Sequence, residues 1–171
     1  MFKMKNLDKK GFTLIELLAV IVVLAIVTVI ATQTVLPFMA NAGRDTFASE
    51  ANMAIDAASD AMSLISLGSV ASSNYTEEAP SGGNKVYCFT IDNLKNLGLF
   101  QKDDSSYEGT VTVTVTGNTY TYATEMKNDR YYVKTTSGTI KAEDYNASTQ
   151  KNGVGSVSSS VTLKTACVPK S

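Results

Sequence analysis

Glu16 is the residue whose chemistry is hardest to explain from its neighbours, because it lies near the start of a long apolar run. The stretch from Leu17 to Gly43 contains no charged residue. A carboxylate at bilayer depth costs about 2.5 to 3.5 kcal/mol on insertion scales, so a chain keeps one there only when something offsets that cost. The sequence therefore predicts a specific partner for Glu16.

The composition offers little for catalysis. The 171 residues include no histidine and no tryptophan, which removes the usual general base and the commonest metal ligand. The charges nearly cancel, with 15 basic and 16 acidic residues, and this argues against a nucleic-acid partner held by a broad basic surface. We therefore expect no enzyme, no cofactor, no metal site and no specific nucleic-acid site.

Cys88 and Cys167 are the only cysteines of the chain. Two thiolates without histidine cannot complete a four-ligand structural zinc site within one chain. If the two residues act as a pair, they form a disulfide, which would close a loop of about 80 residues and stabilise the fold by roughly 4 to 5 kcal/mol at most. Two buried free thiols are the alternative.

The N-terminal segment reads as a targeting or anchoring device. Four lysines and one acidic residue precede the apolar run: Lys3, Lys5, Lys9, Lys10 and Asp8. The positive-inside rule then keeps the short N-terminus cytoplasmic and places everything after about residue 40 outside. As a helix, Leu14 to Leu36 would span roughly 34 Å, enough for a hydrocarbon core of about 30 Å.

Two ordinary interpretations account for part of this segment. One is a plain membrane anchor. The other is a secretory signal peptide cut after Ala40-Asn41-Ala42, which fits the small-x-small rule, although an apolar region of about 7 to 15 residues is usual and this one is longer. Neither explains Glu16, or the glycine at the boundary between the basic and the apolar parts, Gly11.

The stretch "KKGFTLIELL", Lys9 to Leu18, resembles the class III prepilin signal of type IV pilins and their pseudopilin relatives. The resemblance covers about residues 9 to 36. It implies that a membrane aspartic peptidase cuts after Gly11 and that the exposed Phe12 is N-methylated. In this family the leader is short and the apolar segment is retained, which is the reverse of ordinary secretion.

Cleavage at Gly11 would supply a partner for Glu16. The new α-amino group of Phe12 would lie at i and i+4 spacing from the carboxylate, which would also occupy the first helical turn, where the macrodipole favours an anion. We expect this carboxylate to be unpaired in the precursor and paired only after processing or assembly, and the family's behaviour implies pairing between subunits. The site residues are thus Gly11 and Phe12 for processing and Glu16 for assembly.

Many type IV pilins carry a proline near the middle of this helix that locally melts it on assembly. Here the proline comes later, at Pro37. A kink or melted stretch, if the helix has one, should therefore fall near Gln33 to Phe38.

The domain organisation follows from these boundaries. Residues 1–11 are the cleaved leader, residues 12–43 are the apolar transmembrane and filament-core helix, and residues 44–171 are the extracytoplasmic head. Within the head we expect an amphipathic helix at 44–67, a polar loop at 68–84 and an antiparallel sheet region at 85–171. Joined to the apolar run, the amphipathic helix makes one helix from about Thr13 to Leu67, roughly 80 Å long.

The amphipathic helix has a stripe of apolar residues at spacings of three and four. The stripe comprises Phe47, Ala51, Ala54, Ala58, Ala61 and Ile65. Three acidic residues fall off it: Glu50, Asp56 and Asp60. Gly68 is the expected C-terminal cap.

The sheet region contains several strand signals. "KVYCFTI" is a strand candidate, and "DNLKNLG" after it is a short helix with Asp92 as its N-cap and Gly98 as its stop. Two alternating runs around Gly117-Asn118 predict a β-hairpin, whose valines would face the helix: Val111, Val113 and Val115. "DRYYVKTT" would be a third antiparallel strand, and the tail from Val157 to Val168 a weaker last strand.

The segment "KDDSSYEG" offers oxygen ligands for calcium at Asp103, Asp104 and Glu108. A solvated turn accounts for the same residues, and we prefer it.

The sequence predicts an α+β, pilin-like fold: a long N-terminal α-helix, half transmembrane and half amphipathic, packed on an antiparallel β-sheet. The resemblance implies a structural subunit of a type IV pilus, a substrate of a peptidase rather than an enzyme, stored as a single-pass membrane protein and then polymerised into an extracellular filament. Its partners would be further copies of itself, the prepilin peptidase and methylase, the inner-membrane assembly machinery and the membrane. The alternatives are a pseudopilin of a type II secretion or competence machine and a membrane-tethered extracellular binding module.

Overall fold

The computed structural model describes residues 13–101, 106–135, 140, 153–157 and 162–169. The chain divides into two units, Met1–Ala40 and Asn41–Ser171. The first described element, the helix α1 (Leu14–Ser66), runs through the boundary between them. One long helix with this start and end was predicted from the sequence, and it is confirmed.

The N-terminal part of α1 is exposed along its length, since none of Leu14–Gln33 is buried among the described residues. Every side chain from Thr13 to Gln33 is exposed. The hydroxyl groups in this run are satisfied by the helix itself, since Thr28 Oγ1 donates to the Ala25 carbonyl oxygen at 3.1 Å and Thr32 Oγ1 donates to the Val29 carbonyl oxygen at 2.9 Å. The helix assignment is unbroken through Gln33 to Phe38, so this single chain has no melted stretch there.

The C-terminal part of α1 forms the core of the second unit with the sheet. The predicted stripe is confirmed, because Ala51, Ala54, Ala58 and Ala61 are fully buried. Small side chains let a helix approach a sheet closely, which explains the alanines. The helix ends as expected: Gly68 adopts a φ of +69° and its N–H donates to the Ile65 carbonyl oxygen at 2.9 Å.

Glu50 departs from the amphipathic pattern. The spacing placed it off the apolar stripe, yet it is only 6% exposed. Its carboxylate accepts a hydrogen bond from the Tyr107 hydroxyl, which belongs to the segment that leads into the sheet. A buried polar group is tolerated where it is hydrogen-bonded, so this acidic residue belongs to the interface between helix and sheet.

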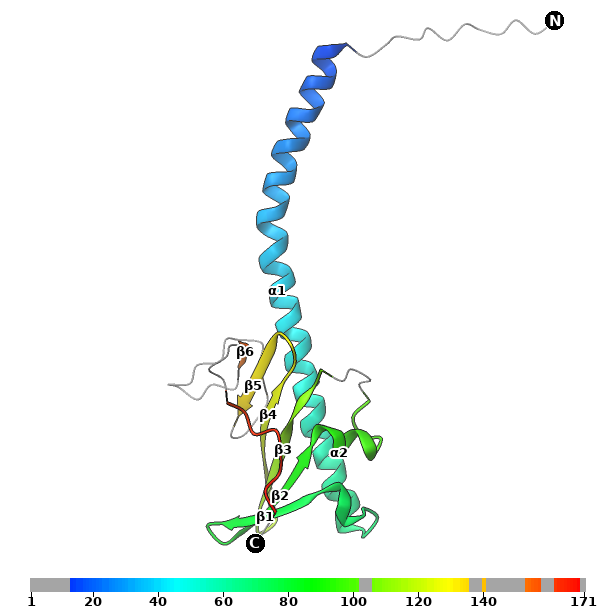
Figure 1. Cartoon of the computed structure of the whole chain (residues 1–171), viewed down its shortest axis with the longest axis vertical. Coiled ribbons are helices and arrows are strands. Elements are labelled where there is room, and N and C mark those ends of the chain that lie inside the picture. Colours follow the sequence, from blue (N-terminus) through cyan, green and yellow to red (C-terminus); the bar gives the residue numbers. More distant parts are fainter. Residues whose placement is uncertain (1–12, 102–105, 136–139, 141–152, 158–161, 170–171) are drawn as a thin grey trace, which may run out of the picture. The chain divides into compact units, whose positions relative to one another are not determined.

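One six-stranded antiparallel sheet packs on the helix, with the strands in chain order. They are β1 (Thr76–Ser81), β2 (Asn84–Thr90), β3 (Glu108–Thr116), β4 (Thr119–Lys127), β5 (Tyr131–Thr135) and β6 (Val154–Ser156). Figure 1 shows the C-terminal part of α1 lying along one face of this sheet. The predicted α+β arrangement is therefore confirmed.

The central hairpin, β3 and β4, follows the predicted alternation. Val111 pairs with Thr124 and Val113 with Tyr122, and both valines are fully buried on the face that packs on α1. Gly117 supplies the positive φ, +60°, that the two-residue turn requires.

In the described part of the chain, two short helical segments lie between the longer elements. A 3-10 turn, η1 (Ser72–Asn74), follows α1, and α2 (Ile91–Asn96) follows β2. The prediction that Asp92 is the N-cap of α2 is wrong. Thr90 is the cap, because its hydroxyl accepts the Asn93 N–H at 3.1 Å while the Asn93 side chain accepts the Thr90 N–H at 3.0 Å.

Two other predictions for the head need correction. The polar stretch 68–84 is not wholly a loop, because β1 lies inside it. β1 is an edge strand, and charged side chains and proline are typical of edges, which need no apolar alternation. Among the described residues the last strand is β6, and it precedes the predicted range of 157–168. Residues 162–169, which follow the undescribed part of that range, have no regular secondary structure.

We call residues 162–169 the C-terminal strap. Side chains of the sheet alternate between two faces, and the residues that contact the strap share the face opposite to α1. They are Glu78 of β1, Cys88 of β2, Thr110 of β3 and Glu125 of β4. In Figure 1 the strap, in red, crosses the sheet to end beside β1. The sheet is thus covered by α1 on one face and, in part, by the strap on the other.

Candidate processing and assembly site

The predicted site lies at the start of α1. Gly11 and Phe12 lie outside the described residues, so the structure neither supports nor contradicts the predicted cleavage. The first described residue, Thr13, contacts Glu16 directly. The Thr13 N–H donates to Glu16 Oε2 at 2.8 Å, and the Thr13 hydroxyl donates to the same oxygen at 2.9 Å.

These contacts form a reciprocal cap. The Glu16 N–H in turn donates to Thr13 Oγ1 at 3.3 Å, so each residue satisfies a backbone donor near the other. In the uncleaved chain Glu16 is therefore hydrogen-bonded to Thr13, while the pairing of its charge with the Phe12 amine stays a prediction. Its carboxylate already stabilises the start of the helix in the uncleaved chain. The sequence contains the signal for this cap, Thr-x-x-Glu before an apolar run, but the prediction for Glu16 considered only the cost of placing a carboxylate in the membrane.

The same helix satisfies the requirements of a membrane span by length and composition. Of the described residues, Leu14–Gln33 form the one helix that is long and apolar enough, and none of this segment is buried within the chain. A surface so apolar and so exposed has to be covered in the working protein. The segment begins two residues after the predicted new N-terminus.

Cys88 and Cys167 are joined in a disulfide. Their Cα atoms are 5.7 Å apart and the residues are separated by 79 positions along the chain. Cys88 is fully buried in β2, and Cys167 belongs to the C-terminal strap. The bond therefore fastens the end of the chain to the sheet.

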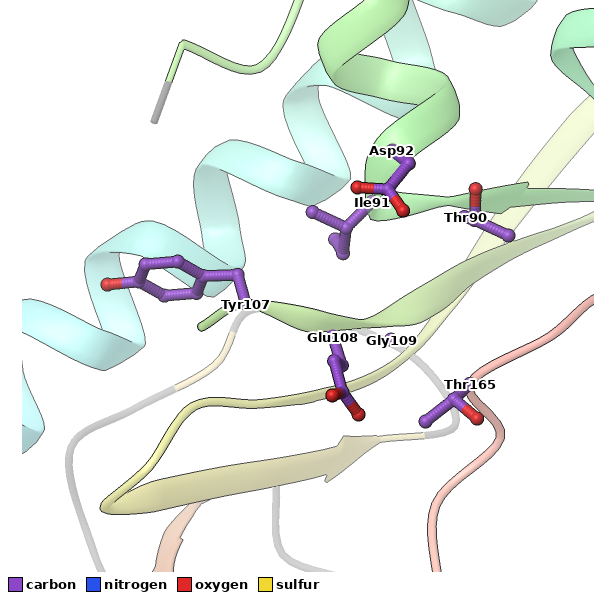
Figure 2. A pocket seen from close by; sticks show the side chains of 7 residues that line it. All are labelled: Thr90, Ile91, Asp92, Tyr107, Glu108, Gly109 and Thr165. Carbon is purple, nitrogen blue, oxygen red and sulfur yellow. The ribbon is translucent and has the colours of Figure 1, made fainter. Parts of the chain in front are cut away.

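A hollow of about 270 Å³ lies where β2 passes into α2. Its lining comprises Thr90, Ile91, Asp92, Tyr107, Glu108, Gly109 and Thr165. Figure 2 shows the Glu108 carboxylate turned away from Asp92, and it forms an ion pair with Lys127 at 3.0 Å. The Tyr107 hydroxyl points the other way, to Glu50. The polar groups of this hollow diverge, so it does not assemble a catalytic set.

Glu108 was also one of three possible calcium ligands. In the structure its carboxylate pairs with Lys127 at 3.0 Å. The other two candidates, Asp103 and Asp104, lie outside the described residues.

The comparisons with known proteins point to the N-terminus. Residues 6–32 match the family model described as the prokaryotic N-terminal methylation motif. The curated proteins gave no match, and the solved structures gave none either.

The motif, the exposed apolar helix and the antiparallel head together fit a membrane-anchored, pilin-like protein. The motif supports the family of type IV pilins and pseudopilins, which are prepilins until their leader is removed and their new N-terminus methylated. It points to a structural protein and implies processing by a prepilin peptidase.

Proposed function

We propose that this chain is the structural subunit of a type IV pilus, stored in the membrane and polymerised into a helical surface filament. The observation that carries the proposal is the methylation motif, residues 6–32, which overlaps an apolar helical segment, Leu14–Gln33, in which every side chain is exposed. Membrane lipid covers that segment in the stored subunit, and the same segment of other copies covers it in the filament. Adhesion, twitching motility or DNA uptake would be the work of the assembled fibre.

Processing begins the cycle. The peptidase removes residues 1–11, and a methyl group is added to the new Phe12 amine. This amine directly precedes Thr13, whose N–H and hydroxyl both bind Glu16 Oε2. The carboxylate has a second oxygen with which to accept the ammonium group, within its own chain or from a neighbouring copy.

Assembly then uses a charge that the membrane penalises. Apolar helices attract one another without direction in lipid, whereas a charge pair fixes where along the axis two helices meet. Glu16 would set this axial register between subunits. The head would form the filament surface, with its chain end fastened by the disulfide.

The N-terminus tests the proposal most directly. We expect intact-mass and N-terminal peptide analysis of protein sheared from cells to show a chain that begins at Phe12, with one added methyl group. A mature N-terminus at Gly43 would indicate a secreted binding module, and an uncut Met1 a plain anchor. Processed protein that stays in the cell envelope and yields no sheared filaments would indicate a pseudopilin.

A further inference from the structure

The carboxylate of Glu78 lies where β1, the C-terminal strap and the disulfide meet. Its side chain is only 13% exposed, and Lys164 Nζ lies 2.6 Å from it. The Val168 N–H donates to Glu78 Oε1 at 3.0 Å. Both contacts come from the strap, one on either side of Cys167.

The two sulfur atoms are close to this carboxylate. A Glu78 oxygen and the sulfur atoms of Cys88 and Cys167 all lie within 4.8 Å of one another. In the register of the two strands, Thr76 opposes Cys88 and Glu78 opposes Val86, so Glu78 and Cys88 are diagonal neighbours on the same face. The strand pairing alone, without the disulfide, places the carboxylate beside the buried cysteine.

We propose that Glu78 is a positioning residue for closure of the disulfide, which holds the strap so that Cys167 faces Cys88 while both are still thiols. The backbone of Lys164 is independently fastened, because its N–H donates to Glu125 Oε2 at 2.6 Å and its carbonyl oxygen accepts the Thr110 hydroxyl at 2.9 Å. The Val168 contact with Glu78 fastens the other side of Cys167. The cysteine is then held at both ends of a short segment.

The charge of Lys164 is part of the arrangement. A lone carboxylate beside two thiols would disfavour the thiolate that attacks in disulfide exchange. The ammonium group at 2.6 Å offsets that charge, so the carboxylate can hold the strap without suppressing the reaction. The same ion pair fastens the strap to β1, so we expect loss of either member to weaken closure at equilibrium.

The reaction is ordinary thiol–disulfide exchange with a small-molecule disulfide such as oxidised glutathione. One protein thiolate attacks that disulfide, releases one glutathione thiolate and forms a mixed disulfide. The second protein thiolate then attacks the first protein sulfur and releases the second glutathione. Two electrons and two protons pass from the cysteine pair to glutathione, and one intramolecular bond forms.

The test is the effective concentration of the two thiols, measured on the full chain in detergent micelles. The reduced protein is equilibrated with mixtures of reduced and oxidised glutathione, and the closed fraction is quantified by alkylation of the remaining thiols. We expect Glu78→Gln to lower the effective concentration about three- to tenfold, as the loss of one charge-assisted contact allows. Glu77→Gln is the matched control, because Glu77 is the neighbouring residue of β1, carries the same charge and is exposed. It should leave the value within about twofold.

A second variant removes the partner of Glu78 on the strap. Lys164→Gln keeps both backbone contacts of residue 164 and removes the cation, so it should lower the effective concentration as Glu78→Gln does, and the double variant should lose little more. In concentrated urea all variants should match wild type, because the effect depends on the folded head. A Glu78→Gln protein that unfolds at lower temperature but closes as readily as wild type would overturn the proposal, as would an equal loss in urea. If Glu78→Gln fails to fold, Lys164→Gln alone decides, and an unchanged value overturns the proposal.

Discussion

At the scale of the residue, the Glu16 carboxylate has two roles, one before and one after processing. It caps the helix through Thr13 in the uncleaved chain, and we propose that it binds the Phe12 amine after processing. The second role could be argued from the sequence, since the spacing from the cleavage site is local. The cap was also predictable from local sequence, because Thr13 and Glu16 have the spacing of a capping box. The prediction considered only the cost of burying the carboxylate in the membrane.

Two substitutions separate these roles. Thr13→Val removes the hydroxyl of the cap, which costs about 1 kcal/mol of helix stability, and should leave the proposed charge pair in place. Glu16→Val removes both the cap and the charge. We expect both variants to be cleaved, because Gly11 and the basic leader are unchanged, but only Glu16→Val to lose filaments. Processed protein in membranes and filaments in the sheared fraction are the quantities to measure, and normal filament yield from Glu16→Val would contradict the pairing.

Tyr87 gives the head a dependence on alkaline pH. Burial raises the pKa of Tyr87, and nearby Glu77, Tyr75 and Tyr120 raise it further. The unfolded chain therefore loses this proton at a lower pH than the folded head does. Stability from the neutral hydroxyl is complete below the ordinary tyrosine pKa of about 10 and is lost as the pH rises through the folded value.

Tyr87→Phe removes this proton. The variant should lose less stability than wild type when the pH is raised from about 8 to about 11. Urea midpoints of both proteins at each pH measure the difference. Parallel decline of the two proteins would show that Tyr87 does not contribute to it.

At the scale of the element, sequence patterns predicted those parts of the fold that have local periodicity. The stripe from Phe47 to Ala61 and the hairpin around Gly117 both repeat at the spacing of their element. β1 has no such pattern, since it is paired on one side only. Glu50 was misplaced for a related reason, because its partner Tyr107 is 57 residues away and no spacing rule connects them.

Gly109 of β3 lies opposite Met126 of β4, where the two backbones approach each other closely. It adopts a φ of +148°, and a Cβ atom there would lie 2.1 Å from the Glu125 carbonyl oxygen and 2.7 Å from the Met126 Cα atom. Both are backbone atoms, so Gly109→Ala has to shift the strand. We expect a loss of about 3 kcal/mol or more in the free energy of unfolding.

The matched control is in the turn of the same hairpin. Gly117 also has a positive φ, +60°, but nothing lies within 4 Å of its added Cβ atom. Gly117→Ala should therefore cost only the conformational strain, about 1 to 2 kcal/mol. Urea unfolding of both variants measures the two costs. Equal losses would show that the close approach at Gly109 is not what restricts that position.

At the scale of the whole molecule, the boundary between the two units, after Ala40, lies close to where charge and hydropathy change along the chain. The C-terminal strap could not be predicted. It has no regular secondary structure, and its contacts with Glu78 span 86 and 90 positions. The cysteine pair and the predicted last strand from Val157 to Val168 both indicated that the end of the chain returns to the sheet, and the sequence left two free thiols as the alternative to the bond.

The contribution of the disulfide to the head is measurable by reduction. Closing a loop across 79 positions restricts the unfolded chain and stabilises the fold by at most about 4.5 kcal/mol in the chain-entropy model. We expect the reduced full chain in detergent to unfold at lower urea concentration but still cooperatively, because contacts with Glu78 and Glu125 hold the strap without the bond.

Near-ultraviolet circular dichroism of the head tyrosines reports this transition in the oxidised and reduced protein. A matched sample with alkylated thiols excludes reoxidation during the measurement. Loss of the cooperative transition on reduction would mean that the strap docks only through the covalent bond. Free thiols in oxidised protein denatured without reductant would mean that the bond is absent, and the stabilisation predicted from it would then be absent as well.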